Sequence, residues 1–314
     1  MKQPLVSVIV VSYNHAPYVR EAILSVVDQS YPNLEVIVVD DASEDDSALL
    51  INQLEAEGHS FRKILNAKNQ GYCKAFNDGF KQSNGEFIID LSADDVLLPN
   101  RVERGVSALV DSNYGVDFCD VYYIDESSKV LGSHFKRDSK NVLKERVPSG
   151  RIFKDLLKRY FICAPGMMMS RKVLSHLGGY DEELYYEDFD FWVRSSHRFD
   201  YHFTNEILVK KRVVSSSMSK DQYLPKCRMI PSTVKVCKKA YALCSTDDEF
   251  KALSKRVGYE MRQAILSNNL AEAKELYALL TSLESKSAVS AFWNLVLKNE
   301  WDLSFMSRFI RKAR

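Results

Sequence analysis

Two adjacent carboxylates, Asp94 and Asp95, follow an apolar run at Phe87–Leu91. Such a run is typical of a strand that is buried on both faces of a parallel sheet. In open α/β sheets, ligands bind in the crevice beyond the carboxyl ends of the strands. Two neighbouring carboxylates repel each other, and a divalent cation that also contacts substrate phosphates would offset this repulsion. The pair therefore indicates a site for a phosphate-bearing ligand and a metal ion.

Polar residues follow two other expected strands in the same way. The apolar segment 6–11 leads into Tyr13, and the segment 34–39 ends in Asp40 and Asp41. A tyrosine at a strand end can stack on a nucleobase, and a carboxylate can accept a hydrogen bond from a base N–H. Taken alone, these residues are better explained as a packing tyrosine and a turn-forming aspartate.

The elements that must position these residues alternate along the chain. Strands are expected at 6–11, 34–39, 61–65 and 87–91, with helices between them starting at Pro17, at 46–57 and at 72–82. This order predicts an α/β fold with a doubly wound parallel sheet. Further strands are expected at 116–124, 167–169 and 207–214, and helices up to Val110, at 152–160 and from Glu187. The segment 127–146 is polar and irregular and is expected to form a hairpin and a loop.

The chain divides by pattern and by charge. Residues 1–218 are expected to form the α/β domain, and residues 219–314 a helical C-terminal extension. From Lys220 onward there are 17 Lys and Arg and 10 Asp and Glu, a net charge of +7, whereas the rest of the chain is at −6. A basic extension favours contact with an anionic partner such as a membrane surface, although a solvated helical face explains it equally well.

Composition excludes several classes of protein. No apolar run reaches the length of about 18 residues that a membrane span requires. The segment 5–11 is short and lacks a cleavage site, so it is expected to be a strand rather than a signal peptide, and the protein is expected to be cytoplasmic. Six scattered cysteines form no Cys-x-x-Cys pair, and the basic residues accompany no nucleic-acid recognition motif.

Several short motifs together identify a family. They are Val6-Ser7-Val8-Ile9-Val10-Val11-Ser12-Tyr13-Asn14, Val38-Val39-Asp40-Asp41-Ala42-Ser43, Asn69-x-Gly71 through Ala75-x-Asn77-x-Gly79 to Gly85-Glu86, Leu91-Ser92-Ala93-Asp94-Asp95, Gly178-Gly179-Tyr180-Asp181-Glu182 and Glu187-Asp188. Each motif is weak alone, but their order and spacing are specific. Over about two thirds of its length, the chain closely resembles the family 2 glycosyltransferases of the GT-A fold, which have a doubly wound mixed sheet.

The resemblance implies a donor site. Members of this family transfer a sugar, with inversion, from a nucleotide-diphosphate sugar to an acceptor hydroxyl, using Mn²⁺ or Mg²⁺. Val11, Tyr13 and Asp41 would hold the base and ribose. Asp94 and Asp95 would hold ribose and metal, with Asp95 in the most direct contact with the metal; Ser92 replaces the more usual first aspartate of this motif.

The resemblance also implies a catalytic base. In this family it is the second acid of a Glu-Asp pair at the start of a helix, which corresponds to Asp188. A carboxylate at a helix N-terminus is held in its ionised form by the helix dipole. Without the family, Asp188 and Asp190 could equally be residues that only favour the dipole.

Two departures from the family concern positive charge near the diphosphate. Phe76 stands where an arginine is frequent, and Lys74 or Arg101 could replace it. The segment after the last strand has no histidine, and Lys211 or Arg212 could screen the phosphates instead.

The acceptor is expected to be a saccharide or a lipid-linked saccharide in cell-surface polysaccharide or glycolipid synthesis. Aromatic residues and arginines near the C-terminus could contact the inner face of the membrane, or could pack on the catalytic domain or on a second copy in a homodimer.

Two other functions are alternatives to glycosyl transfer. A sugar nucleotidyltransferase would have a Gly-rich basic loop after the first strand, which residues 12–17 lack. A non-catalytic nucleotide-sugar-binding module is the other alternative.

Overall fold

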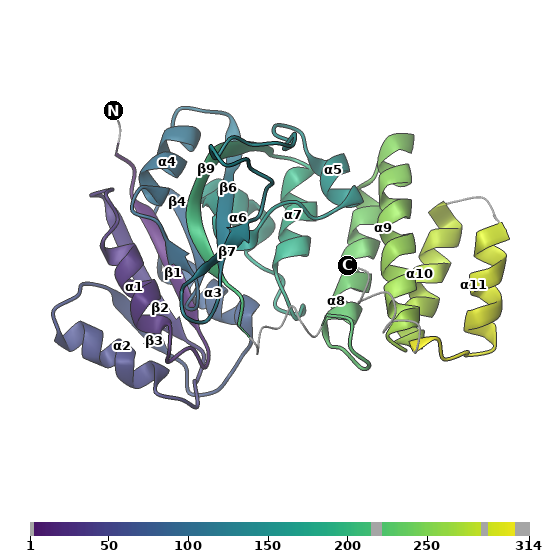
Figure 1. Ribbon diagram of the computed structural model, residues 1–314, viewed down its shortest axis with the longest axis horizontal. Helices are drawn as coiled ribbons and strands as arrows, with labels where there is room; N and C mark the ends of the chain where they lie inside the picture. The colour runs from purple at the N-terminus through teal and green to yellow at the C-terminus, as the bar shows by residue number, and fades with distance from the viewer. Residues whose placement is uncertain (1–2, 215–221, 284–287, 305–314) are drawn as a thin grey trace. The chain divides into compact units, whose positions relative to one another are not determined.

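The computed structural model describes the chain except for residues 1–2, 215–221, 284–287 and 305–314 (Figure 1). Its strands are β1 (Val6–Ser12), β2 (Leu34–Asp40), β3 (Arg62–Leu65), β4 (Phe87–Ser92), β5 (Val96–Leu97), β6 (Tyr114–Ile124), β7 (Val130–Ser133), β8 (Met167–Ser170) and β9 (Asp200–Arg212). Its α-helices are α1 (Val19–Val27), α2 (Ser47–Ala56), α3 (Tyr72–Gln82), α4 (Arg101–Leu109), α5 (Phe153–Lys158), α6 (Arg171–Leu177), α7 (Asp188–Ser196), α8 (Met229–Leu243), α9 (Asp247–Leu266), α10 (Leu270–Leu283) and α11 (Ala288–Lys298).

The chain forms two compact units that do not follow chain order. The first comprises Met1–Ile152, Phe161–Glu183 and Arg198–Ser215, and the second comprises Phe153–Tyr160, Leu184–His197 and Ser216–Arg314. The sequence boundary expected between residues 218 and 219 falls outside the described residues and stays a prediction.

The first unit contains one mixed sheet with the strand order β3-β2-β1-β4-β8-β6-β9-β5, and β7 pairs with β6 (Figure 1). The first four strands in this order are parallel to one another. Strand β8 runs antiparallel to both β4 and β6, and β9 runs parallel to β6. The predicted doubly wound mixed sheet is confirmed.

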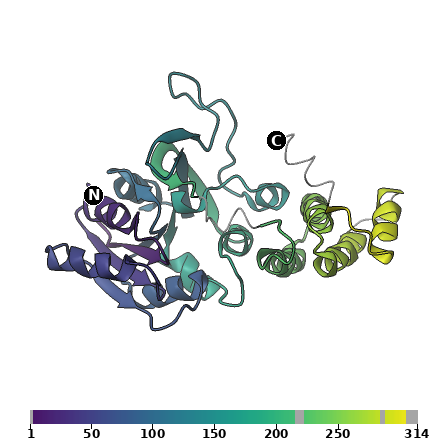
Figure 2. The same ribbon diagram turned by 60° about the horizontal axis from the view of Figure 1, so that its bottom comes forward.

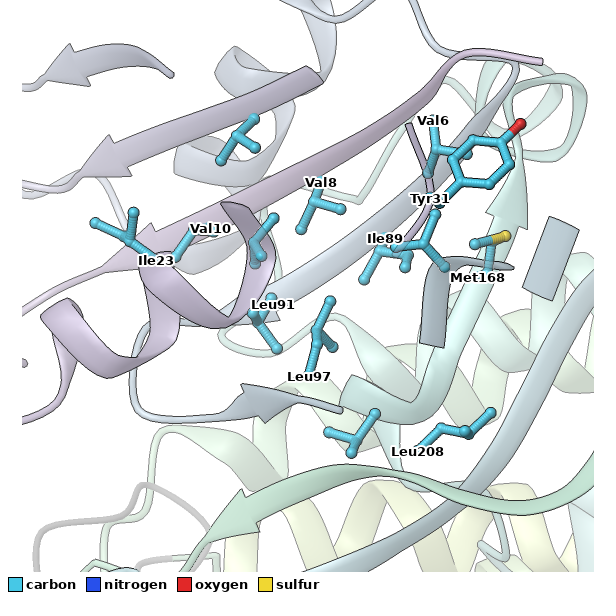
Figure 3. Close-up of a cluster of buried hydrophobic side chains, with 14 of the residues drawn as sticks. Val6, Val8, Val10, Ile23, Tyr31, Ile89, Leu91, Leu97, Met168 and Leu208 are labelled. Atoms are coloured by element: carbon cyan, nitrogen blue, oxygen red, sulfur yellow. The ribbon is translucent and has the colours of Figure 1, made fainter. Parts of the chain in front are cut away.

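Successive side chains of the central strands point to opposite faces of the sheet, and helices cover both faces. Val8 and Val10 of β1, with Ile89 and Leu91 of β4, pack against α1 residues such as Ile23 in one buried cluster (Figure 3). The same cluster includes residues of α2 and α4, so these three helices lie on one face. The helix α3 contacts β1 and β2, and it packs on the opposite face.

The helix α3 comes unusually close to the sheet because it has a glycine at the contact. A Cβ added to Gly79 would lie 2.6 Å from Cγ2 of Ile9 and 3.1 Å from Cγ2 of Val39. These distances are shorter than normal carbon–carbon contacts. A glycine at this position therefore sets the distance between α3 and the parallel strands.

Three elements differ from the sequence expectation. Strand β9 begins at Asp200 instead of residue 207, because its first residues pair with β6, as Tyr201 does with Val116. Strand β5 has two residues and pairs with β9. The helix α6 was not expected, and it ends at Gly178, which adopts a left-handed conformation with φ of 74°.

The second unit is helical. The helices α8, α9 and α10 contact one another, α7 packs on α8, and α5 packs on both α7 and α9 (Figures 1 and 2). A capping box starts α9: Thr246 Oγ1 accepts from the Glu249 N–H (3.3 Å) and the Glu249 carboxylate accepts from the Thr246 N–H (3.0 Å). The helical C-terminal region expected from the sequence is therefore present. None of the described helices has both the length and the apolar composition of a membrane-crossing segment.

Candidate functional site

The ends of three parallel strands meet at one edge of the first unit. The Asp41 N–H donates to the carbonyl of Ser12 (2.8 Å), and the Ala93 N–H donates to the carbonyl of Val11 (2.9 Å). The end of β1 is therefore flanked on one side by the residues after β2, and on the other by the residues after β4. Val11, Asp41 and the Asp94–Asp95 turn consequently lie at the same sheet edge, where open α/β sheets bind ligands.

The loops after β1 and β2 are fixed to each other by side-chain hydrogen bonds. The Asn14 N–H donates to Ser43 Oγ (2.9 Å), and the His15 N–H donates to Ser47 Oγ (2.9 Å). Asn14 itself has a φ of 56°, a left-handed conformation that asparagine tolerates. Tyr13, which directly precedes these two residues, is 40% exposed, so its ring is available to a ligand.

The Asp41 carboxylate organises the loop before α3. Although Asp41 is only 2% exposed, its oxygens accept from Asn66 Nδ2 (2.8 Å), from the Gln70 N–H (3.0 Å) and from the Gly71 N–H (2.8 Å). A carboxylate has about four lone-pair sites. The Gln70 N–H also lies 3.1 Å from Asp41 Oδ1, so the protein already makes four contacts to this carboxylate, and Asp41 holds the loop in place.

Asp95 is buried at the same edge, at 3% exposure. Burial raises the pKa of its carboxyl well above the ordinary range, and the charge of Asp94 raises that pKa further. The charges of Lys211 and Arg212 and the Arg212 N–H, which donates to Asp95 Oδ1 (2.8 Å), act in the opposite direction. The ionised pair is thus short of positive charge, and a divalent cation would supply it.

The chemistry of these residues fits a hard divalent ion. Among the described residues, no three His, Cys, Asp or Glu side chains are grouped so that they could hold a metal ion by themselves. Mg²⁺ and similar ions are nevertheless commonly held by one or two carboxylates together with substrate phosphates. Asp94 and Asp95 match that pattern, with a phosphate group completing the ligand set.

The prediction that Arg212 screens phosphates is wrong, because its side chain is 1% exposed and is used inside the protein. Its Nε donates to the carbonyl of Asp94 (3.0 Å), its Nη1 to the carbonyl of Asp125 (3.0 Å) and to Ser128 Oγ (2.9 Å), and its Nη2 to Glu21 (2.6 Å). Arg212 therefore fixes the acidic turn in place.

Arg101 is also unavailable to a diphosphate, contrary to the sequence expectation. Its side chain is fully buried, donating from Nη1 to Asp117 (3.0 Å) and from Nη2 to the carbonyl of Gly166 (2.9 Å). Lys74, the other residue considered for this role, forms an ion pair with Asp78 one turn further along α3. Of the four cations considered, Lys211 is the one whose charge acts on Asp95 while its side chain is only partly buried.

Sequence reasoning missed a buried carboxylate below the site. Asp90 Oδ1 accepts from the hydroxyl of Tyr72 (2.7 Å), and its Oδ2 accepts from the hydroxyl of Tyr180 (2.9 Å). Burial raises the pKa of Asp90 to about 7, although the two tyrosines lower it. The backbone of Tyr180 is in turn bonded to Asn77 of α3 on both its N–H and its carbonyl (2.9 Å each). The position of Asp90 inside an apolar strand was the sequence signal that could have revealed this buried carboxylate.

Asp188 belongs to the second compact unit. It is the first residue of α7, after the N-cap Glu187, and its Oδ1 accepts from the Phe189 N–H (2.6 Å). The side chain is partly buried. A carboxylate in the first turn of a helix is stabilised in its ionised form by the helix dipole.

Comparison with known proteins identifies the family. The sequence pattern described as "Glycosyl transferase family 2" matches residues 7–178. An uncharacterized glycosyltransferase of Methanocaldococcus jannaschii is 30% identical over 240 residues, which are 73% of this chain and 76% of the relative. One from Rickettsia typhi is 31% identical over 215 residues, 67% of this chain; the match spans only 64% of that relative's length.

Solved structures show the same fold. Staphylococcus aureus TarS 1–349 in complex with UDP gives a TM-score of 0.67 at 15% identity, covering 99% of this chain and 92% of that one. The mannosyltransferase PcManGT from Pyrobaculum calidifontis, in complex with GDP-Man and Mn²⁺, gives 0.61 at 17% identity, covering 98% and 83%. Both support the GT-A assignment. The fold, the acidic residues at the sheet edge and the family match agree, and the chain belongs to glycosyl transferase family 2.

Proposed function

We propose that this glycosyltransferase transfers a hexose, with inversion, from a nucleotide-diphosphate sugar to an acceptor hydroxyl. The observation that supports this most directly is that Val11, Asp41 and the Asp94–Asp95 turn lie together at the carboxyl edge of β1, β2 and β4. In a member of this family, that edge is the natural place for a donor nucleotide.

Each residue has a proposed role in holding the donor. Tyr13 stacks on the base, and Asp41, next to Val11 at the end of β1, accepts a base N–H in addition to holding the loop before α3. Asp94 binds the ribose and shares the metal with Asp95, which is the principal metal ligand. A bound Mn²⁺ or Mg²⁺ would neutralise charge that develops on the leaving diphosphate.

Asp188 is proposed to act as the general base. As the acceptor oxygen forms its bond to the anomeric carbon, the bond from that carbon to the diphosphate breaks on the opposite face. The diphosphate leaves with the electron pair, and Asp188 takes the proton of the acceptor hydroxyl. A positioned base of this kind contributes about 10²- to 10⁴-fold to rate.

A thermal-shift panel tests donor binding. UDP, GDP and their sugars are added to the full chain with Mn²⁺ or with EDTA. Because a ligand that binds only the folded state raises the melting temperature, at least one nucleotide should raise it, and more so with Mn²⁺. Asp95→Asn should lose the Mn²⁺-dependent part of this rise in melting temperature. Glu103 is an exposed carboxylate on α4, and Glu103→Gln should retain the full rise. No shift with any nucleotide would contradict the proposal.

The two alternative functions predict different products. A sugar nucleotidyltransferase would release pyrophosphate from a nucleoside triphosphate, and a binding module would give a thermal shift without turnover. The proposed transfer instead releases a nucleoside diphosphate in proportion to a glycosylated acceptor. Measuring these products separately distinguishes the three functions.

The proposed acceptor is a saccharide or lipid-linked saccharide at the cytoplasmic face of a membrane. In the C-terminal region, α11 exposes Phe292 and Leu295, and Trp301 follows it, about half exposed. Aromatic and aliphatic side chains beside basic residues suit a membrane interface. Sedimentation with anionic phospholipid vesicles should pull down the full chain, and Phe292→Glu with Leu295→Glu should weaken it. Association of two copies, one of the two alternatives to membrane contact, would appear as a dimer by light scattering.

A further inference from the structure

The segment that contains Asp188 is held on its N-terminal side by α8. The Tyr185 N–H donates to Ser232 Oγ (2.9 Å), and the Tyr186 hydroxyl bonds to Thr233 Oγ1 (2.7 Å). Ser232, Thr233 and Tyr186 are buried. These contacts fix the two residues that lie just before the Glu187–Asp188 corner.

Immediately after Asp188, the same helix holds the first turn of α7. Lys239 Nζ of α8 donates to Asp190 Oδ1 (2.7 Å), and Arg194 Nε donates to Asp190 Oδ2 (2.6 Å). The Asp190 side chain is only 1% exposed. Removing a cation from a buried carboxylate costs more than losing a surface ion pair, so Lys239 constrains the turn in which Asp188 lies.

A buried arginine of α9 contacts the same turn. The guanidinium of Arg256 lies 3.9 Å from the ring centroid of Tyr160 and 5.7 Å from that of Phe189. Its Nη1 donates to Glu260 (3.1 Å), and both charged side chains are buried. Phe189 directly follows Asp188, so the residues on both sides of Asp188 pack against helices of the C-terminal region.

We propose that α8 and α9 position the catalytic base, with Lys239 as the principal positioning residue and Arg256 supporting it. The inference rests on the proposed role of Asp188. It gives the C-terminal helices, which the family match to residues 7–178 does not cover, a part in catalysis. Because small displacements of a reacting group reduce rate strongly, loosening this turn should lower turnover without weakening donor binding.

The chain offers a matched pair of lysines for the test. Lys238 is adjacent to Lys239 on α8, but it pairs with Glu275 of α10 at the surface, where both side chains are about half exposed. Hydrogen–deuterium exchange of the full chain is measured for Lys239→Met and Lys238→Met. Lys239→Met should increase deuterium uptake in residues 184–197 at least about threefold, and Lys238→Met should leave it unchanged. Equal uptake in the two variants would overturn the inference.

Kinetics separate positioning from a general loss of folding. With the donor that the wild type turns over, Lys239→Met should lower kcat about tenfold at an unchanged donor KM, and Lys239→Arg should restore kcat to within about twofold of wild type. Lys238→Met should match wild type in both constants. If Asp188→Asn abolishes transfer but Lys239→Met matches Lys238→Met, the positioning inference fails and the base stands. If Asp188→Asn retains transfer, the base assignment itself fails.

Discussion

A carboxylate inside an apolar strand is costly unless the protein neutralises it or surrounds it with donors. Asp90 is in this situation, since two tyrosine hydroxyls donate to it in the middle of β4. It links β4 to the start of α3 and to the loop that contains Tyr180. A group with so large a pKa change on folding must make stability depend on pH.

The direction of that dependence follows from proton binding. The folded protein holds the Asp90 proton up to a pH of about 7, whereas the ordinary pKa is 3.8. The stabilisation is therefore complete below pH 3.8 and is lost as the pH rises to about 7. Asp90→Asn removes this titration, so only the wild type loses this stabilisation as the pH rises. The melting temperature of the variant should therefore increase relative to that of the wild type between about pH 5 and about pH 8. A flat difference would refute the assignment.

The buried Arg101–Asp117 ion pair gives a second prediction at this scale. Replacing Arg101 with methionine leaves Asp117 buried without its cation, and His202 and Thr204 as its remaining donors (2.9 and 2.6 Å). We expect Arg101→Met to destabilise the protein by about 3 kcal/mol in urea unfolding. Arg104→Met, one turn along α4 in an exposed pair with Glu206, should change stability by less than about 0.5 kcal/mol. Similar losses in both variants would contradict this account.

At the scale of elements, local pattern was sufficient where an element is long and periodic. The helix expected at 72–82 is α3, residue for residue, and the four parallel strands lie close to their expected positions. The sequence pattern did not predict elements whose extent depends on pairing between strands. Strand β5 has two residues and pairs with β9, and the start of β9 depends on its pairing with β6.

Long-range partners likewise explain the errors at the site. The sequence locates Asp41, Asp94 and Asp95 at strand ends, and the sheet brings those ends together. Arg101 and Arg212 are candidates for phosphate contact in the sequence only because their partners, such as Asp117 and Glu21, lie on other elements. The roles proposed for the acidic residues remain predictions.

The close approach of α3 to β1 can be tested through its glycine. Gly79→Ala would place a methyl group 2.6 Å from Ile9, and we expect a net loss of about 1–2 kcal/mol in unfolding free energy from this overpacking. In α9, a Cβ at Gly258 would meet no side-chain atom closer than Arg262 Nη1, at 3.5 Å. Gly258→Ala should therefore stabilise the protein by about 0.5–1 kcal/mol through helix propensity. A stabilising effect of Gly79→Ala would show that α3 does not pack as described.

At the scale of the whole molecule, the proposed donor residues and the proposed base belong to different compact units. The segments 153–160 and 184–197 leave the sheet-containing unit and join the C-terminal helices in a second one. The helical region is more than an appendage to the sheet, since its buried contacts include the turn that begins with Asp188.

The most direct test compares transfer with donor binding in Asp188→Asn. The variant keeps the size of the side chain and removes the group proposed to accept the acceptor proton. The account predicts that kcat for glycosyl transfer falls at least about 100-fold while the dissociation constant of the nucleotide with Mn²⁺ stays within about twofold of wild type. Near-normal transfer by Asp188→Asn would contradict it.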